Sequence, residues 1–348
     1  MREVLEKVLA REDLTREEAK AAFLTLIDDT VTPSQVGALL TALRMKGETP
    51  VEIMGFVEAM RERAVKVDLS VRPIVDTCGT GGDRSGSFNI STMAALVVAG
   101  VGQPVAKHGN RAVSSRCGSA DFLETLGIRV GLDPQAVKQS LEETGFAFLM
   151  APHYHPATRQ VAGIRRELKV ETVFNSLGPL TNPVSPEFQL VGVSSLPKGR
   201  RMAEVLRLMN KSRAFVVHNE MGYDEMTPCG RNWVIEVANG ANREFIVEAA
   251  DCGVSPCRPE DLRGGAPEDN ARIGMAILKG ERGPKRDTTL INAGMALWAA
   301  GRASDLKEGM EQAAESIDSG RAFGIVDSLR RLFPYDGASP LVRLAWDL

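Results

Sequence analysis

Hydrophobic residues follow a helical spacing through the first part of the chain, and one start signal occurs there three times. Thr15, Thr32 and Thr49 are each followed three residues later by Glu or Gln, which is a capping box. Behind each signal, apolar residues recur every three or four positions, as on the buried face of an amphipathic helix. Residues 1–13 are also amphipathic. The pattern predicts a small all-helical domain at the N-terminus.

From about residue 72, short apolar runs alternate with helical segments. This alternation predicts a large α/β domain with a central, mainly parallel sheet flanked by helices. Around Asn239-Gly240 we expect a hairpin whose connection is longer than two residues. We place the helical domain at 1–69 and the α/β domain at 70–348, with residues near 156–185 returning to the helical domain. The expected strands are 74–75, 104–106, 146–150, 189–193, 214–217, 233–237 and 244–248, and the expected later helices are 93–101, 133–144, 199–208, 269–278, 287–299, 304–318 and 322–332.

A glycine-rich turn follows the first apolar strand and reads Gly79-Thr80-Gly81-Gly82-Asp83. Glycines let backbone N–H groups approach a bulky anion and adopt positive φ. The segment Asn89-Ile90-Ser91-Thr92 sits just ahead of the helix expected at 93–101, where a helix N-terminus favours phosphate. The turn matches neither the P-loop nor the dinucleotide-binding motif, so those mechanisms do not apply. We expect an anion site here.

A second polar cluster follows the strand expected at 104–106. It begins with Lys107-His108-Gly109-Asn110-Arg111 and continues to Ser114-Ser115-Arg116. Cations, an amide and hydroxyls at this density suit a multiply charged anion better than a neutral ligand. The two clusters together predict a site for a phosphorylated compound.

Two adjacent acids, Asp224 and Glu225, come just past the strand expected at 214–217. Adjacent acids on loops are usually only solvated. At the carboxyl end of a core strand, however, they are suited to hold Mg²⁺ against a polyphosphate. A Ser/His/Asp hydrolase is disfavoured, because the chain has no G-x-S-x-G turn and Ser114-Ser115 lie among cations. The four histidines, His108, His153, His155 and His218, fall within or beside these sites.

Composition narrows the class of protein. The chain has 348 residues, of which 43% are hydrophobic and 25% charged, enough for about two soluble domains. A net charge of −3 without a basic tail disfavours nucleic acid as a partner. No signal peptide or transmembrane run is apparent, so no membrane association is expected. Five cysteines favour a reducing cytoplasm, and Cys252 and Cys257, the closest pair in sequence, lack further Cys/His support for zinc.

Four motifs in this order, GTGGD, the NIST helix start, KHGNRAVSS and GSAD, resemble the anthranilate phosphoribosyltransferase family. The resemblance covers about residues 5 to 332. It implies transfer of phosphoribosyl from phosphoribosyl pyrophosphate to the amino group of anthranilate, a step of tryptophan synthesis, which gives N-(5-phosphoribosyl)anthranilate and pyrophosphate. It also implies Mg²⁺, two ions per subunit, and a cytoplasmic homodimer that forms through the N-terminal helices.

The resemblance also implies residue roles. Arg165 would hold the acceptor's carboxylate, which a guanidinium fork matches; without the family it reads as a solvated helix arginine. No acid–base residue is assigned, because the arylamine is already neutral near pH 7. The Mg²⁺ ligands would be Ser91, Asp224 and Glu225. The acceptor would meet Gly79, His108, Asn110, His155, Arg165, Gly178 and Pro179. Phosphoribosyl pyrophosphate would meet Gly79, Gly82, Asp83, Ser87, Asn89, Ile90, Ser91, Thr92, Lys107, His108, Gly109, Asn110, Arg111, Ala112, Val113, Ser114, Ser115 and Ser119.

Two alternatives stay open at this stage. A pyrimidine nucleoside phosphorylase of the same superfamily would share the helical domain and the anion loop but bind one phosphate and a nucleobase. The Asp224-Glu225 pair and Arg165 speak against it, because a phosphorylase needs neither Mg²⁺ nor a carboxylate clamp. A catalytically silent relative that binds nucleic acid would need a basic groove, which the acidic net charge disfavours.

Overall fold

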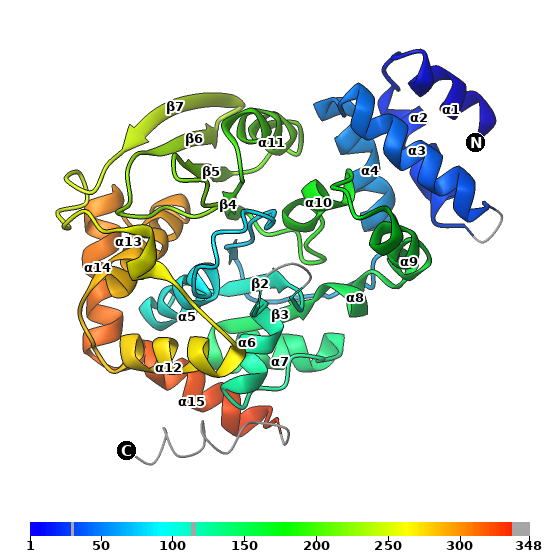
Figure 1. Cartoon of the computed structure of the whole chain (residues 1–348). Helices are drawn as coiled ribbons and strands as arrows, with labels where there is room; N and C mark the ends of the chain where they lie inside the picture. Colours follow the sequence, from blue (N-terminus) through cyan, green and yellow to red (C-terminus); the bar gives the residue numbers. More distant parts are fainter. Residues whose placement is uncertain (29–30, 113–115, 336–348) are drawn as a thin grey trace.

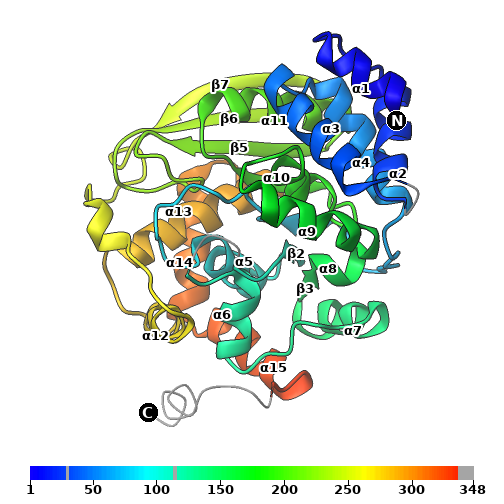
Figure 2. The same ribbon diagram turned by 45° about the vertical axis from the view of Figure 1, so that its right-hand side comes forward.

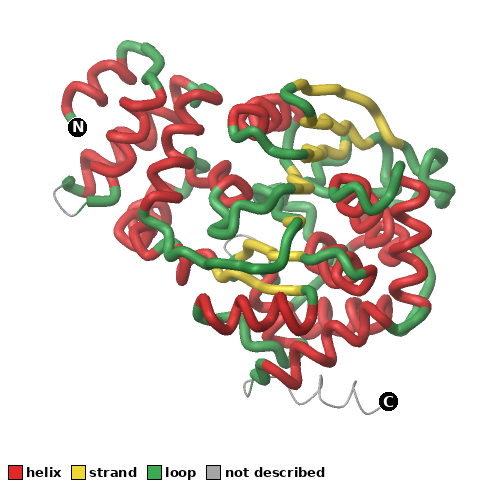
Figure 3. The backbone as a smooth tube through the Cα atoms, turned by 180° about the vertical axis from the view of Figure 1, so that it is seen from behind, coloured by secondary structure: helices red, strands yellow, loops and turns green. Residues whose placement is uncertain are grey.

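The computed structural model describes residues 1–28, 31–112 and 116–335. A bundle of helices at one corner adjoins a larger body built on one sheet (Figure 1). Seen from behind, the strands run through the middle of this body with helices on both sides (Figure 3). The expected fold class, a small helical domain plus a larger α/β domain, is confirmed.

The N-terminal bundle consists of α1 (Arg2–Leu9), α2 (Arg16–Leu26), α3 (Pro33–Lys46) and α4 (Pro50–Glu62). All three capping boxes are present, and each threonine hydroxyl accepts the backbone N–H three residues on. Gly47 ends α3 at φ 87°, a conformation that glycine adopts without strain. The start signals of these helices were therefore readable from the sequence.

The sheet has seven strands in the order β3-β2-β1-β4-β5-β6-β7. Its first five members pair in parallel, and β6 and β7 are antiparallel. Strand β1 lies between β2 and β4, so the strand order reverses there, and open α/β sheets bind ligands at the carboxyl ends of the strands at such a point. The strands are β1 (Val75–Asp76), β2 (Val105–Gly109), β3 (Phe146–Met150), β4 (Phe188–Gly192), β5 (Arg213–Asn219), β6 (Asn232–Ala238) and β7 (Ala241–Val247).

Two strand predictions were wrong in detail. Strand β2 runs on to Gly109, so Lys107 and His108 lie within the strand rather than after it. The β6–β7 connection is the two-residue turn Asn239-Gly240, not a longer loop. Both turn residues have positive φ, 52° and 73°, which suits the twist of a tight hairpin.

Helices cover both faces of the sheet and form two large apolar clusters. On β5, Phe215 and Val217 face a cluster with the later helices, whereas Ala214 and Val216 face a cluster that continues into the N-terminal bundle. The helices of the α/β body are α5 (Ile90–Val101), α6 (Ser119–Thr125), α7 (Pro134–Thr144), α11 (Leu196–Leu208), η3 (Pro259–Leu262), α12 (Pro267–Leu278), α13 (Pro284–Ala299), α14 (Leu306–Asp318) and α15 (Arg321–Leu332).

The segment after β3 turns back to the bundle. It comprises α8 (Ala151–Tyr154), η1 (Pro156–Thr158), α9 (Arg159–Leu168), α10 (Phe174–Leu177) and η2 (Gly178–Leu180). Phe174 packs on Phe23 of α2 with ring centroids 5.2 Å apart, and α9 lies beside α3 (Figure 2). The domain boundary at residue 69 remains a prediction, because one apolar cluster runs across it. No described helix is long and apolar enough to cross a membrane.

Candidate active site

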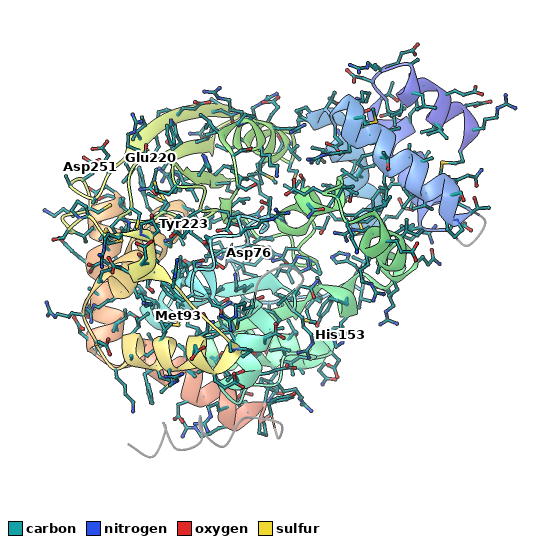
Figure 4. The ribbon with its side chains drawn as sticks, in the orientation of Figure 1. Asp76, Met93, His153, Glu220, Tyr223 and Asp251 are labelled. Carbon is teal, nitrogen blue, oxygen red and sulfur yellow. The ribbon has the colours of Figure 1, made fainter. Side chains whose placement is uncertain are left out.

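Most predicted site residues lie at or after the carboxyl ends of β1, β2 and β5, and the expected acceptor residues His155, Arg165, Gly178 and Pro179 follow β3. The glycine-rich turn follows β1, and the loop with Asp224 and Glu225 follows β5. Figure 4 labels Asp76, the last residue of β1, near the middle of the molecule, and Tyr223, next to the acid pair, on the loop after β5. The order of the strands therefore brings together two motifs that lie far apart in the sequence.

The glycine-rich turn packs directly on the acid pair. The Gly81 N–H donates to Asp224 Oδ2 at 2.8 Å, and the Thr80 N–H donates to the Gly192 carbonyl at 2.8 Å. A Cβ added at Gly79 would lie 2.8 Å from Asp224 Oδ2, so a side chain there would displace this carboxylate. Gly81 and Gly82 adopt φ of 64° and 80°, as the sequence predicted for this turn.

Asp83 joins Asp224 and Glu225 in a cluster of three carboxylates. One oxygen from each lies within 4.8 Å of the others. Burial and the neighbouring Asp83 raise the pKa of Asp224 to about 7, and burial and Asp224 raise the pKa of Glu225 well above its ordinary value. Within the described chain, Asp83 Oδ2 and Glu225 Oε2 are buried without a hydrogen-bond partner. Crowded, unsatisfied carboxylate oxygens of this kind fit a hard divalent cation.

The sequence placed Asp83 among the phosphate contacts and missed its position beside the metal candidates. Its place in the glycine-rich turn hid this role, since only the fold brings that turn to the loop after β5. Ser91, the third expected metal ligand, instead has its hydroxyl 3.3 Å from Lys107 Nζ. Its contact with a metal ion remains a prediction.

The N-terminus of α5 lies beside the residue that follows β1, because Thr77 Oγ1 donates to the Ser91 carbonyl at 2.9 Å. The helix begins at Ile90, three residues earlier than expected, so Ser91 and Thr92 lie in its first turn. Asn89, the N-cap residue, makes no side-chain cap within the described structure, and its Oδ1 and Thr92 Oγ1 are buried without partners there. Uncapped helix N–H groups beside free polar atoms are suited to bind phosphate oxygens.

Lys107 lies beneath this helix rather than in an exposed loop. Its side chain is 2% exposed, and Nζ donates to the Thr77 carbonyl at 2.6 Å. Asp76 is equally buried, and burial raises its pKa to about 6 although Lys107 opposes the rise. The ammonium group of Lys107 is thus a buried positive charge between β1 and the first turn of α5.

The loop between β2 and α6 is held by its own polar groups. The Asn110 N–H donates to Ser119 Oγ at 3.2 Å, and the Ala112 N–H donates to Asp121 Oδ2 at 2.9 Å. Arg111 binds Glu124 through Nη2 at 2.7 Å, so its guanidinium pairs with α6. In the loop after the glycine-rich turn, the backbone of Ser87 forms an isolated antiparallel β-bridge with Arg263. The remaining expected contacts, Val113, Ser114 and Ser115, lie outside the described residues.

His108 and His155 are buried to 2% and 3% exposure and lie edge to face, with ring centroids 5.4 Å apart. Burial lowers their pKa values to about 3 and about 4, so both rings are neutral at physiological pH. His108 Nδ1 donates to the Gly178 carbonyl and His155 Nε2 to the Thr181 carbonyl. The ring of His155 is thus already packed against His108 and hydrogen-bonded to Thr181. Its expected packing against a flat ligand remains a prediction.

Arg165 extends from α9 over the ring of Phe174, with the guanidinium carbon 4.9 Å from the ring centroid. Burial alone lowers its pKa, and no carboxylate of the described residues pairs with it. A half-buried guanidinium without a counter-ion can accept an anionic ligand.

The cysteines and the other two histidines do not join the carboxylate cluster in the described part of the chain. The closest thiols are Cys229 and Cys257, with Sγ atoms 2.9 Å apart, rather than the sequence neighbours Cys252 and Cys257. His153 is exposed, and His218 Nδ1 lies 3.1 Å from the Val193 carbonyl. Within the described residues, no histidine or cysteine belongs to the carboxylate cluster.

Comparison with known proteins identifies this arrangement. Residues 2–64 match the family described as "Glycosyl transferase family, helical bundle domain", and residues 71–323 match its a/b domain. A relative from Pelotomaculum thermopropionicum, named anthranilate phosphoribosyltransferase, is 48% identical over 97% of this chain and 97% of its own. A second, from Desulforudis audaxviator, is 50% identical over 92% and 93%. The chain belongs to the anthranilate phosphoribosyltransferase family.

Solved structures of this family have the same fold. The anthranilate phosphoribosyltransferase of Thermus thermophilus superimposes with a TM-score of 0.90 at 42% identity, over 94% of this chain and 98% of its own. The enzyme of Saccharomyces cerevisiae, solved in complex with PRPP and Mg, gives a TM-score of 0.88 at 29% identity, over 95% and 96%. The family resemblance drawn from the four motifs is thereby confirmed.

Proposed function

We infer that this enzyme transfers the phosphoribosyl group of phosphoribosyl pyrophosphate to the amino group of anthranilate. The products are N-(5-phosphoribosyl)anthranilate and pyrophosphate, as in tryptophan synthesis. Relatives with this name cover nearly the whole chain. The observation that carries the inference is the cluster of Asp83, Asp224 and Glu225 packed on the glycine-rich turn, with Arg165 at the bundle side.

We assign the donor's phosphates to the glycine-rich turn and the first turn of α5. This assignment is supported by the polar groups available there: the backbone N–H groups of Gly79 and Gly82, the hydroxyls of Ser91 and Thr92, and the amide of Asn89. Donors held in place before the reaction stabilise the leaving anion without reorganising. We keep Ser87, Ser119 and residues 107–115 in the proposed set of donor contacts.

We assign Mg²⁺ to Asp83, Asp224 and Glu225, with Ser91 as a further ligand; a pair of ions per subunit remains our proposal. Bound between these carboxylates and the pyrophosphate, Mg²⁺ would neutralise negative charge that develops on the leaving group. The yeast relative was solved with PRPP and Mg, which supports the metal. The raised carboxyl pKa values support it too, because a cation would relieve their mutual repulsion.

We assign the acceptor to the space between Arg165 and the turn Gly178-Pro179. The guanidinium would hold the carboxylate, and Asn110 would donate to the same ligand. Loss of pyrophosphate makes the ribosyl carbon cationic, so catalysis depends on placing the neutral amine in line with it. A strong base is not needed for this step, which agrees with the lowered pKa values of His108 and His155.

A nucleoside phosphorylase is disfavoured by the three-carboxylate cluster, which such a reaction does not use. Turnover that continues unchanged in excess chelator would favour that alternative. The direct test follows the fluorescence of anthranilate with phosphoribosyl pyrophosphate and Mg²⁺. Our proposal requires fluorescence to change only when all three are present with the enzyme. We further propose a cytoplasmic homodimer through the N-terminal bundle; a monomer by light scattering at micromolar concentration would contradict this.

A further inference from the structure

Four successive carbonyls after α10 each accept a hydrogen bond from a side chain of a different part of the fold. The donors come from β2, β4, α4 and the end of α8. The pairs are Gly178 O with His108 Nδ1 at 2.8 Å, Pro179 O with Gln189 Nε2 at 2.7 Å, Leu180 O with Arg61 Nη2 at 3.0 Å, and Thr181 O with His155 Nε2 at 2.9 Å. We call these four side chains the carbonyl cradle.

The cradle donates hydrogen bonds to carbonyls of the turn that lack good donors within the turn itself. Pro179 has no N–H, and the local bond from the Thr181 N–H to the Gly178 carbonyl is long at 3.5 Å. Buried carbonyls need donors, and here remote elements supply them. The next residue continues the arrangement, since Asn182 Nδ2 donates to Asp76 Oδ2 and to the Ala106 carbonyl, both at 2.9 Å. The position of the turn is therefore fixed by the sheet and by the helical bundle together.

The protonation of the donors agrees with this use. A neutral imidazole carries one N–H, and in both His108 and His155 that N–H meets a carbonyl. Gln189 is 1% exposed and pairs with Asp76 in the register of β1 and β4. Arg61 is the only cradle member from the helical bundle, so its bond to the Leu180 carbonyl links the two parts of the molecule.

At Gly178 the turn leaves space for a side chain, although Pro179 and Leu180 are buried. A Cβ added at Gly178 would meet nothing within 4 Å, whereas one added at Gly79 would collide with Asp224. Gly178 has φ −49° and ψ −57°, so its backbone does not demand glycine. The open face of the turn is the face that our proposed function gives to the aromatic acceptor.

We propose that Arg61 and Gln189 are positioning residues for the acceptor. They hold the Leu180 and Pro179 carbonyls so that the open face at Gly178 lies flat against the aromatic ring, and neither touches the ligand. This inference rests on the proposed function. Because Arg61 belongs to α4, the position of the turn beside the acceptor also depends on the position of the helical bundle.

The test replaces each donor by an unbranched apolar side chain, in Arg61→Met and Gln189→Met. An unsatisfied buried carbonyl should shift the turn, so the KM for anthranilate should rise about 5-fold or more. The KM for phosphoribosyl pyrophosphate should change by less than about twofold. Arg61→Lys keeps a cationic donor and should fall between wild type and Arg61→Met.

Tyr154→Phe is the matched control. It also removes one buried donor to a backbone carbonyl, that of Leu132 at 2.8 Å, but outside the cradle. It should lower thermal stability and leave both KM values unchanged. If a methionine variant does not fold, Gln189→Asn or Arg61→Lys takes its place, with the same split expected at smaller size.

Wild type is assayed first, so the two failures can be told apart. No turnover by wild type would remove the proposed function itself. Turnover by wild type, with equal changes of both KM values in the cradle variants, would overturn only the positioning role. An unchanged KM for anthranilate beside a Tyr154→Phe-like loss of stability would also overturn it.

Discussion

Replacement of Arg165 by methionine should separate binding of the acceptor from stability of the fold. Methionine keeps an apolar stem against Phe174 and removes the charge. The guanidinium has no carboxylate partner among the described residues, and burial lowers its pKa. Among the described residues this desolvated charge has no counter-ion, and we expect the acceptor's carboxylate to supply one.

The expected sizes follow from these contacts. Loss of a charge-assisted hydrogen bond costs about 1.5–3 kcal/mol, which corresponds to about 10- to 150-fold in the KM for anthranilate. The contact with Phe174 contributes about 0.5–1 kcal/mol, and relief of desolvation opposes its loss. We expect the free energy of unfolding to change by less than about 1 kcal/mol, the typical size for a point substitution.

The assay measures both KM values by anthranilate fluorescence and the free energy of unfolding by denaturant. Direct binding of anthranilate is titrated as well, because KM equals affinity only when chemistry is slow. Arg166→Met is the control: it removes the neighbouring arginine of α9, which is exposed. It should leave the KM for anthranilate unchanged.

A rise in the KM for phosphoribosyl pyrophosphate, with anthranilate unaffected, would refute the placement of the acceptor on α9. Equal effects of Arg165→Met and Arg166→Met would also refute it, since only the first removes a buried charge. A large loss of stability in Arg165→Met would show that the guanidinium has a structural partner after all.

Three further predictions concern two residues assigned to the phosphoribosyl pyrophosphate and metal site and one, Gly178, assigned to the acceptor site. Above pH 7 in chelator, the melting temperature of Asp224→Asn should exceed that of wild type by at least about 2 °C. The pKa of Asp224 is raised to about 7, so the protonated carboxyl group stabilises the fold fully below pH 3.8. This contribution is lost as the pH rises through about 7, and asparagine, which does not ionise, avoids the loss. Added Mg²⁺ should stabilise wild type much more than this variant, and equal stabilisation would exclude Asp224 as a ligand. Gly178→Ala should fold with unchanged or slightly raised stability, because the added methyl group meets nothing within 4 Å. It should weaken the binding of anthranilate measured by calorimetry, and unchanged binding would exclude Gly178 from the acceptor site. Lys107→Met should raise the KM for phosphoribosyl pyrophosphate more than that for anthranilate in steady-state kinetics, and the reverse order would contradict our donor assignment.

Features written in adjacent residues could be predicted from the sequence. The capping boxes at Thr15, Thr32 and Thr49 each lie within four residues, and all three form. The alternation of strands and helices gave the fold class, and the glycine-rich turn indicated its positive φ values. These signals are local, so packing has little opportunity to override them.

Features that depend on distant partners could not be predicted. The place of Asp83 beside Asp224 follows from the strand order and not from either motif. His108 resembled a loop ligand because polar residues are uncommon in buried strands, yet its N–H satisfies a carbonyl seventy positions later in the chain. The return of residues near 156–185 to the bundle was expected, but no spacing rule reveals its contacts, such as that of Phe174 with Phe23.

The central claim is the transfer of phosphoribosyl to an arylamine, and identification of the products tests it most directly. The enzyme is incubated with anthranilate, phosphoribosyl pyrophosphate and Mg²⁺. The products are then separated, identified and quantified by mass spectrometry. Our account predicts N-(5-phosphoribosyl)anthranilate and pyrophosphate in equal amounts, and neither in the presence of chelator. Pyrophosphate released without the anthranilate adduct, or adduct formed at the full rate in chelator, would contradict it.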